Sequence, residues 1–478
     1  MSGEIPHQST GRPGSAAVAA GSGATRDAAV AMLRHGGTAI DAVVAGAFAA
    51  TVAEPTLASL GGGGFCLVAE PDGAPRIIDF FVNVPGLGGD GRIPHMESLC
   101  VTFGDHAVQD FEVGWGSVAV PGALEGLLAL HARGGRLPLA DILAPAITAA
   151  REGIHLDDVQ VRFIRVIGPI LTLTPESAAL FTPPLEGQAF RNPAYADVLT
   201  RIAAGPLPTS AYADPLVAAV QAGGGLLTHE DLRAYRVVER RPVGGRRGTS
   251  SLWTNPPPAF GGAIVLETLG LVPEVANPWP ALADALVQST HRHRGGVRRG
   301  TTHLSVIDAE GRVAALSMSN GSNSGTVVHG VTLNNMLGEA DLNPGGWHAL
   351  DAGTRLRSMM APTLVIDDDG TRTVLGTGGS ERIRSALVQT LVRTLDHGDD
   401  LASAVAAPRL HATETLIDVE PGLRPEDSTW TWREGHPPVR EWPSRDLYFG
   451  GVHAVRRDPD GRVTAVGDHR RGGATAIV

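Results

Sequence analysis

The sequence predicts an α/β (α+β) fold in which a strand-rich core lies between outer helices, an αββα layering. Two observations support this prediction. The first 300 residues carry mostly helical patterns with some strands, whereas residues 301–478 carry mostly strand patterns. The length of 478 residues, 43% of them hydrophobic, is enough for a large buried core.

The first half is expected to contain mostly helices, with two apolar strands among them. Four glycines at 61–64 lead into the first of these strands, and Pro71-Asp72-Gly73 forms the turn to the second. Thr228 has the residue type and position of an N-cap for a short helix. Helices are expected at residues 17–33, 41–52 and 263–271, and helical regions at 118–160 and, with polar breaks, at 160–230. The strands are expected at 65–68 and 76–80.

The second half is expected to consist mainly of strands. The first two form a hairpin, residues 301–307 and 312–319, with the turn at residues 308–311. The other strands are expected at residues 327–333, 363–366, 373–376, 452–456 and 463–466. An amphipathic helix should follow the glycine-rich residues 376–380. Its apolar face would consist of Ile383, Leu387, Val388, Leu391, Val392 and Leu395.

Charge and residue usage exclude several classes of function. A formal net charge of −11 argues against binding to nucleic acid or to an anionic membrane. All 39 basic residues are arginine, which excludes a lysine Schiff base, enzyme-bound pyridoxal phosphate and a phosphate-loop lysine. Cys66 and Cys100 are too few for a disulfide framework or a zinc site, and each is expected to be a small buried residue.

The N-terminal sequence and the most apolar stretch indicate a cytoplasmic protein. The N-terminus lacks the basic and apolar regions of a secretory signal. Residues 42–53, the most apolar stretch, are too few to span a bilayer.

Residues 273–300, with three prolines and an Arg- and His-rich end, have the composition of a solvated loop. An exposed linker is also what chain cleavage requires.

Thr301, at the start of the expected hairpin, is the candidate nucleophile. A threonine hydroxyl needs a base within hydrogen-bond reach, and a free α-amine on the same residue, with an unperturbed pKa of about 7.7–8.0, would supply one. Breaking the peptide bond after Gly300 would create that amine. The turn places Thr301 opposite Met318 or Ser319, so Ser319 could hydrogen-bond the Thr301 amine or hydroxyl. Cross-strand threonines with a purely structural role are the alternative.

Gly378 and Gly379 are the candidate oxyanion-binding residues. Acyl transfer needs donors for a developing negative charge. Glycines at the start of the expected helix would leave backbone N–H groups open beside the positive end of the helix dipole. A phosphate site would use the same geometry, but the Gly-x-Gly-x-x-Gly order and the phosphate-loop lysine are absent. An ordinary glycine-rich turn is the alternative.

Motifs are spread from about residue 14 to residue 478. They are Gly36-Gly37-Thr38-Ala39-Ile40-Asp41-Ala42, Glu54-Pro55 with Gly61 to Phe65, Val120-Pro121-Gly122 with Gly126, Leu143-Ala144-Pro145-Ala146, Pro256-Pro257-Pro258 with Gly261-Gly262, Thr301-Thr302-His303-Leu304-Ser305-Val306, Leu333-Asn334-Asn335-Met336, Ser358 to Thr363, Gly378-Gly379 and Asp468 to Ala474. Jointly they resemble the γ-glutamyltranspeptidase family of N-terminal-nucleophile (Ntn) hydrolases.

The resemblance implies a four-layer αββα sandwich that cleaves itself between Gly300 and Thr301. The products would be a heavy chain, residues 1–300, and a light chain, residues 301–478, with Thr301 as the nucleophile. Because cysteines are few and the histidines near Thr301 lie in or beside the linker, we expect activity without a metal or cofactor. The expected partner is a small-molecule amide or carbonyl substrate.

The expected substrate pocket departs from the family pattern. The family holds a γ-glutamyl α-carboxylate with an arginine and two serines, and these positions are Phe81, Ser358 and Met359 here. An aspartate that holds the α-ammonium corresponds to Glu339, and Ser319 replaces a threonine. Each lost charge-assisted hydrogen bond is worth about 1.5–3 kcal/mol. The usual head group should therefore bind poorly, and the substrate should be larger or more apolar.

Two other functions are compatible with the sequence. The resemblance extends to natural-product-pathway members that hydrolyse another C–N bond, or a C–C bond, next to a carbonyl. An uncleaved, non-catalytic homologue that serves as a binding or scaffold protein is the other alternative.

Overall fold

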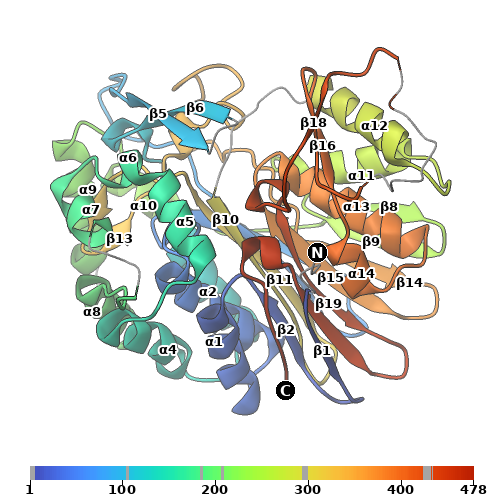
Figure 1. The fold of residues 1–478 in the computed structure, drawn as a ribbon. Coiled ribbons are helices and arrows are strands. Elements are labelled where there is room, and N and C mark those ends of the chain that lie inside the picture. Colours follow the sequence, from blue (N-terminus) through green and yellow to red (C-terminus); the bar gives the residue numbers. More distant parts are fainter. Residues whose placement is uncertain are drawn as a thin grey trace.

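Two facing β-sheets form the centre of the molecule, and helices cover their outer faces (Figure 1). The computed structural model describes residues 6–103, 107–182, 187–205, 209–292, 300–423, 432 and 434–478. In this part of the chain the αββα layering predicted from the sequence is confirmed. In the stretch 273–300, expected to be a solvated loop, residues Trp279–Arg292 instead form helix α12, whose Leu282 and Leu286 are buried, and residues 293–299 lie outside the described part.

Each sheet has seven strands in the described residues, and both combine strands from the two halves of the sequence. The first sheet has the order β1 (His7–Gly11), β20 (Val463–Gly467), β19 (Gly451–Arg457), β15 (Arg372–Gly378), β14 (Thr363–Asp367), β9 (Ser250–Thr254), β8 (Val243–Arg247). The second has the order β21 (Ala474–Ile477), β2 (Ala17–Ala20), β10 (Gly300–Ile307), β11 (Val313–Gly321), β3 (Gly63–Ala69), β4 (Arg76–Phe80), β7 (Val238–Arg240). All pairs within them are antiparallel.

The outer layers are helical, as expected. On the side of the second sheet lie α1 (Gly23–Arg34), α2 (Ala39–Ala53), α3 (Ala123–Gly134), α4 (Leu139–Glu152), α5 (Asp158–Val166), α6 (Gly168–Leu171), α7 (Pro175–Phe181), α8 (Pro193–Ala203), α9 (Thr209–Ala222) and α10 (His229–Ala234). On the side of the first sheet lie α11 (Gly261–Leu271), α12 (Trp279–Arg292), α13 (Arg382–Leu395) and α14 (Leu401–Ala406). The predicted N-cap at Thr228 is confirmed, because its side chain accepts a hydrogen bond from Asp231 N at the start of α10.

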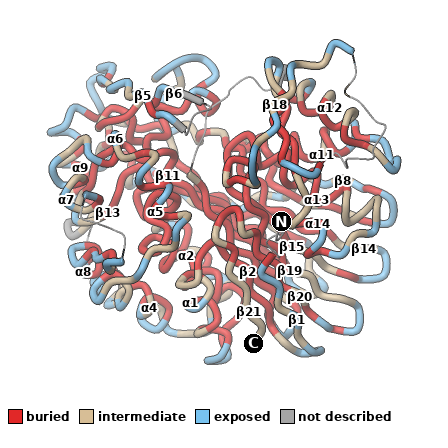
Figure 2. The backbone as a smooth tube through the Cα atoms, in the orientation of Figure 1, coloured by how far each residue is buried: buried red, intermediate tan, exposed pale blue. Residues whose placement is uncertain are grey.

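The core occupies the space between the sheets and the space between each sheet and its helices. Figure 2 shows the central strands buried and the exposed residues concentrated in the outer loops and helix surfaces. Helix α2 is buried along its whole length, because it packs against α1 and α4 as well as on β10 and β11. The small residues noted in its sequence permit this close approach. Two short strand pairs and one small three-stranded sheet complete the described fold. The pairs are β5 (Glu97–Phe103) with β6 (Ala107–Val113) and β12 (Val327–Val328) with β13 (Val331–Thr332). The small sheet consists of β16 (Leu410–Ala412), β17 (Ile417–Val419) and β18 (Val439–Glu441).

Three further predictions about the fold and burial were wrong. Residues 17–20 form a strand and not the start of a helix, because pairing with β10 and β21 overrides the helix propensity of alanine, and α1 begins only after the N-cap Ser22. Residues 327–333 form a tight hairpin and not one strand, since His329 and Gly330 adopt left-handed conformations. Cys100 is exposed, because its neighbour Val101 takes the inward face of β5.

Candidate active site

The hairpin of β10 and β11 presents the bond between Gly300 and Thr301. In its register Gly300 pairs with Gly321 and Thr302 with Met318, and the register shifts between these two pairs. Thr301 therefore lies in a β-bulge, a feature that re-aims a side chain relative to a regular ladder. Thr301 is buried, with 4% of its surface exposed.

Ser319 contacts the carbonyl of this bond. Its hydroxyl donates to the Gly300 carbonyl oxygen at 2.6 Å and accepts from the Gly321 N–H at 3.0 Å. The sequence predicted a hydrogen bond from Ser319 to the amine or hydroxyl of Thr301. The structure places the hydroxyl on the preceding carbonyl, since the bulge brings Gly300 alongside Gly321. A donor on a carbonyl oxygen favours attack on its carbon, because negative charge develops on that oxygen.

Gly378 lies against Thr301 from the opposite sheet. A Cβ atom on Gly378 would stand 2.0 Å from the Thr301 carbonyl oxygen, so only glycine fits there. The next residue, Gly379, has a φ of +127°, which residues with a side chain rarely adopt. These glycines do not lie at the start of a helix as expected: Gly378 ends β15, and α13 begins only at Arg382. Their role as oxyanion donors stays a prediction.

The residues expected to bind substrate gather around Thr301. Phe81, Ser358 and Met359 line one small pocket with Thr301 and Ser319, and the space between them is no larger than one water molecule needs. The remaining lining residues are Met336, Met360, Ser380 and Ile383. The Phe81 ring stacks on Phe65 with a centroid distance of 5.4 Å.

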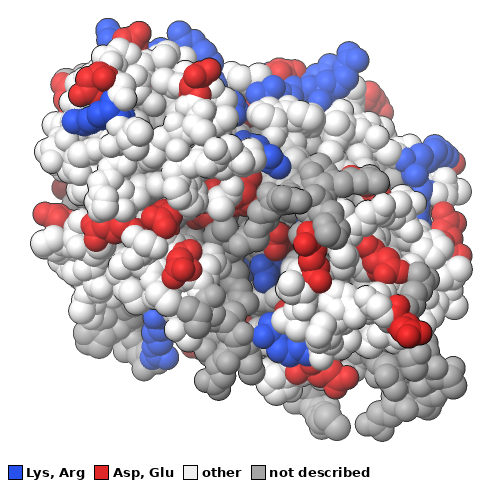
Figure 3. All heavy atoms as spheres, turned by 90° about the horizontal axis from the view of Figure 1, so that it is seen from above, with Lys and Arg blue, Asp and Glu red and all other residues white. Residues whose placement is uncertain are grey.

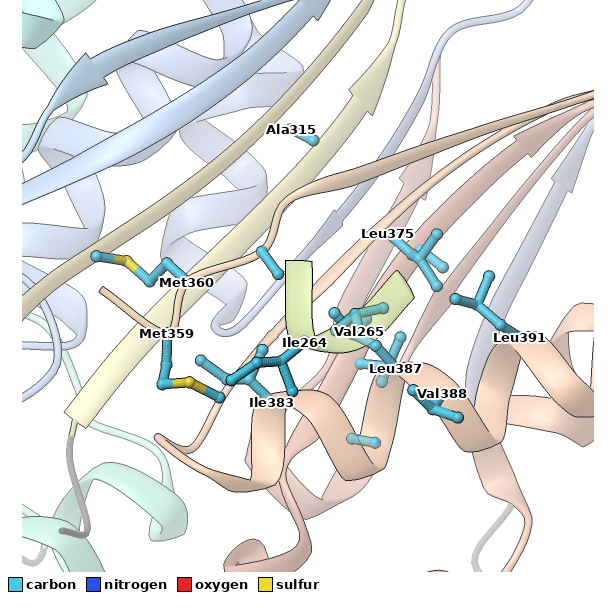
Figure 4. Close-up of a cluster of buried hydrophobic side chains, with 14 of the residues drawn as sticks. Ile264, Val265, Ala315, Met359, Met360, Leu375, Ile383, Leu387, Val388 and Leu391 are labelled. Carbon is cyan, nitrogen blue, oxygen red and sulfur yellow. The ribbon is translucent and has the colours of Figure 1, made fainter. Parts of the chain in front are cut away.

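The apolar walls of this donor pocket belong to the large core cluster that the two sheets share with the helices of the first sheet. Figure 4 shows Met359 beside Ile264 and Ile383, at the start of α13. Five of the nine lining residues are apolar, Phe81 and Met359 among them, and the other four carry hydroxyl groups. The predicted lining residue Glu339 does not reach it: Glu339 is buried next to β11 and accepts a hydrogen bond from the Ser322 hydroxyl at 3.2 Å.

Glu54, at the C-terminal end of α2, lies on the other face of β10. Its carboxyl group accepts hydrogen bonds from the hydroxyls of Thr302 at 2.5 Å and Thr25 at 2.7 Å. Burial raises the pKa of Glu54 to about 7 against the lowering effect of these hydroxyls, and Asp157 adds to the rise. The carboxyl group thus fixes Thr302, the residue next to the candidate nucleophile Thr301. The sequence gave Glu54 only as part of a motif, because nothing local signals a contact across 248 residues.

The raised pKa of Glu54 predicts a pH dependence of stability. A carboxyl group that binds its proton more tightly in the folded state stabilises the fold below its unfolded pKa of about 4.5. That stabilisation is lost as the pH rises through about 7. We expect roughly 3 kcal/mol of unfolding free energy to disappear over this window. In Glu54→Gln the loss should be much smaller.

Urea unfolding at pH 5 and pH 8 measures this difference, in a Thr301→Ala background so that the chain is expected to stay in one piece. Glu152→Gln, at an exposed position in α4, is the matched control. An equal change in unfolding free energy between pH 5 and pH 8 for the Glu54 variant and its parent would contradict the raised pKa of Glu54.

A buried polar network joins the two sheets below Thr301. The ring of His303 is hydrogen-bonded to the hydroxyls of Ser317 at 2.8 Å and Ser305 at 2.9 Å, and Ser305 donates to the His453 carbonyl at 3.0 Å. Burial holds the pKa of His303 well below its usual range, so the ring is neutral at pH 7. Gly376 opposite leaves room for this ring. The network fixes β10 relative to β15 and β19.

A larger cavity opens on the other side of Gly300. It has a volume of about 490 Å³, within the range of small-molecule sites, and it reaches Gly379. Helix α5 contributes Phe163 and Val166 to its wall, and residues 442–448 contribute Trp442 and Tyr448. The sequence gave no sign of this cavity, because its walls come from segments that are distant along the chain.

Two properties of the described residues bear on cofactors and membranes. No three or more His, Cys, Asp and Glu side chains within them are grouped so that they could hold a metal ion. None of the helices in the described ranges combines the length and apolar character needed to cross a membrane.

Comparisons with known proteins agree with the fold. A crystal structure of cephalosporin acylase from Bacillus halodurans superimposes with a TM-score of 0.80 at 24% identity, covering 98% of this chain and 96% of that one. This likeness shows that the two chains share a fold. The sequence model of the family described as Gamma-glutamyltranspeptidase matches residues 25–294 and 276–478. The chain therefore belongs to the γ-glutamyltranspeptidase family of hydrolases and transferases.

Relatives of nearly full length are similar to this chain. An Acylase ACY 1 proenzyme of Pseudomonas sp. (strain V22) is 28% identical over 94% of this chain and 90% of its own length. A Glutathione hydrolase proenzyme of Escherichia coli (strain K12) is 26% identical over 92% of this chain and 88% of its own length. The family predicted from the sequence motifs is thus confirmed.

Proposed function

We propose that this chain is a precursor that cleaves its own Gly300–Thr301 bond and then uses Thr301 to transfer or hydrolyse the acyl group of an amide. The observation that carries the proposal is the geometry of that bond. It lies in a bulge, and its carbonyl oxygen accepts the Ser319 hydroxyl at 2.6 Å. The similarity to relatives named as proenzymes supports it.

The cleavage is an acyl shift followed by hydrolysis. The Thr301 hydroxyl loses its proton and attacks the Gly300 carbonyl carbon, and Ser319 stabilises the oxyanion. The C–N bond then breaks, and the α-nitrogen of Thr301 takes up the proton as the Gly300 ester forms on the threonine oxygen. Water hydrolyses this ester to a Gly300 carboxylate and a free N-terminal Thr301. The heavy chain is residues 1–300 and the light chain residues 301–478.

In the cleaved protein the Thr301 amine acts as the base for its own hydroxyl. An unperturbed α-amine has a pKa of about 7.7–8.0, so a useful fraction is neutral near pH 7. The hydroxyl attacks the substrate carbonyl, the leaving group takes the proton, and the acyl-Thr301 ester then passes to water or to an amine. The backbone N–H groups at Gly378 and Gly379 supply the donors for the oxyanion of the tetrahedral intermediate.

The donor pocket favours an amide without a free α-carboxylate at the family's usual position. Phe81 and Met359 occupy two of the three clamp positions and leave Ser358 as the polar group. Relatives named as acylases support an amide substrate other than glutathione. A carbonyl compound cleaved at a C–C bond, as in a natural-product pathway, is the second candidate. The apolar side chains of Phe81 and Met359 cannot hydrogen-bond an amide nitrogen, so they do not select for an amide.

Intact-mass measurement and N-terminal sequencing of the purified wild-type protein test the proposal directly. We expect chains of 300 and 178 residues, the second starting at Thr301. A single chain, or a light chain that starts elsewhere, would overturn it. Incubation with a γ-glutamyl anilide, a set of simple amides and matching ketones then separates the two substrate candidates.

Restoring the clamp should restore the family's usual substrate. In Phe81→Arg/Met359→Ser, a guanidinium and a second hydroxyl join Ser358, and we expect γ-glutamyl anilide turnover to rise about 10-fold or more over wild type. The double variant should exceed the combined effect of the single ones, because both groups contact one carboxylate. Steady-state kcat/KM for all four proteins measures this. A wild-type KM already in the micromolar range would show that the pocket does not reject the head group.

A further inference from the structure

Arg471, in the short helical turn η4 (His469–Arg471), is buried without a full set of partners. It is 7% exposed, its Nε donates to the Leu447 carbonyl at 3.2 Å, and its Nη1 has no hydrogen-bond partner among the described residues. The preceding residue behaves differently: Arg470 pairs with Glu420 at 2.6 Å and Asp468 at 3.1 Å. A buried guanidinium without a carboxylate is costly, so Arg471 needs a functional explanation.

The guanidinium of Arg471 lies against the turn that contacts Thr301. A Cβ atom placed on Gly378 would stand 3.1 Å from Arg471 Nη1, and one on Gly379 would stand 3.2 Å from Arg471 Nη2. On its other side the guanidinium carbon lies 5.3 Å from the centre of the Phe163 ring. Arg471 thus stands between the candidate oxyanion-binding turn and the wall of the 490 Å³ cavity.

Among the described residues that line the cavity, arginines outnumber acidic residues. Four arginines line it, and Asp446, the acidic residue among its lining residues, is already paired with Arg162 at 2.7 Å. Arg382 lies on the Tyr448 ring, with its guanidinium carbon 4.0 Å from the ring centre. Burial and the nearby Arg382 lower the pKa of Arg471 to about 10, although Asp446 and Asp468 act in the opposite direction.

The rest of the cavity wall is mostly apolar. Phe111, Phe163, Trp442, Val166 and Ile167 line it, so a ligand would exchange water for aromatic and aliphatic surface over most of its length. Figure 3 looks onto this end of the sandwich, where acidic and basic side chains are interspersed and basic atoms are visible in the recess near the centre.

We propose that this cavity is a subsite for a part of the substrate that has an aromatic body and a carboxylate. The apolar wall would contact the aromatic body, and Arg471 and Arg382 would hold the carboxylate beside Gly379. The inference rests on the proposed function, because it places this group next to the carbonyl that Thr301 attacks. A planar guanidinium matches a carboxylate with two parallel hydrogen bonds, and Arg471 Nη1 is available for one. In this proposal the carboxylate binds in the cavity beside Gly379, and not in the small pocket that Phe81 lines.

A matched pair of ligands tests the charge preference directly. The probes are 4-phenylbutyrate and 4-phenylbutanamide, which differ only in carboxylate and amide, and calorimetry gives both dissociation constants on the mature protein. We expect the carboxylate to bind about 10- to 100-fold more tightly. Arg471→Gln should remove this preference and Arg382→Gln should reduce it. Arg246→Gln, an exposed arginine of β8 that pairs with Asp368, is the matched control and should keep it.

The Gly300 carboxylate produced by cleavage is a second possible source of the same group, and a Thr301→Ala chain distinguishes the two. In that chain Gly300 stays in a peptide bond. A preference in both proteins supports a substrate subsite, whereas a preference only in Thr301→Ala would overturn it, because the chain's own carboxylate would then fill the site. Equal binding of both probes to wild type would overturn it as well. If the wild type stays uncleaved but keeps the preference, the proposed function fails and the carboxylate site stands.

Discussion

Thr301→Ala is expected to leave one chain of 478 residues and no detectable hydrolase activity. Alanine removes the hydroxyl that attacks the Gly300 carbonyl, and without cleavage the α-amine that serves as base is never released. Both steps are lost together, so the effect should be complete and not partial. A denaturing gel shows the first result, and an amide-hydrolysis assay shows the second.

Thr301→Ser is the control, because serine keeps a hydroxyl and, after cleavage, the same N-terminal amine. It should mature, more slowly or at a similar rate, and keep activity. Cleavage of the alanine variant at the wild-type position would show that another group, or a contaminating protease, breaks the bond. The proposed mechanism would then be wrong.

Ser319→Ala should slow self-cleavage by about 10²- to 10³-fold, the usual effect of losing one oxyanion donor. The hydroxyl donates to the Gly300 oxygen at 2.6 Å before any reaction, so it is already in place when charge develops there. We expect freshly purified protein to be mostly full-length and to convert over hours to days. The half-life of the full-length band measures the rate.

Ser319→Thr keeps the hydroxyl and is the matched control for this prediction. It should restore cleavage to within a few-fold of wild type. An alanine variant that matures as fast as wild type would show that the hydrogen bond to Gly300 is only structural, and would leave the backbone at the bulge as the source of catalysis.

Much of the fold followed from local patterns. The hairpin at Thr301, the helix of residues 382–395 and the strand after the four glycines have strong periodicity and clear turn residues, and all were found where expected. Residues 17–20 were misassigned, because their partners β10 and β21 lie about 285 and more residues away and decide the outcome.

The sequence predicted those site residues whose chemical role depends on residue type. It did not predict contacts that depend on the three-dimensional geometry. Thr301, Gly378 and Phe81 were found from residue type and motif, and the structure brings them together. The bulge that turns Ser319 toward Gly300 is a register shift of one residue, which no pattern in the hairpin specifies. Arg471 was missed for a related reason: its isolation becomes visible only when Arg470 is seen to take the acidic partners.

The mixed strand order of the two sheets has a consequence for how long the enzyme lasts. In the second sheet β2 lies between β21 and β10, and in the first β14 pairs with β9, so strands on both sides of Gly300 hydrogen-bond directly to one another. If that bond is cut as proposed, neither piece can rebuild its sheets alone. Refolding would then require two separate chains to associate, whereas the uncut chain folds with its halves tethered. The lifetime of a cleaved enzyme would therefore be set by the rate at which it unfolds.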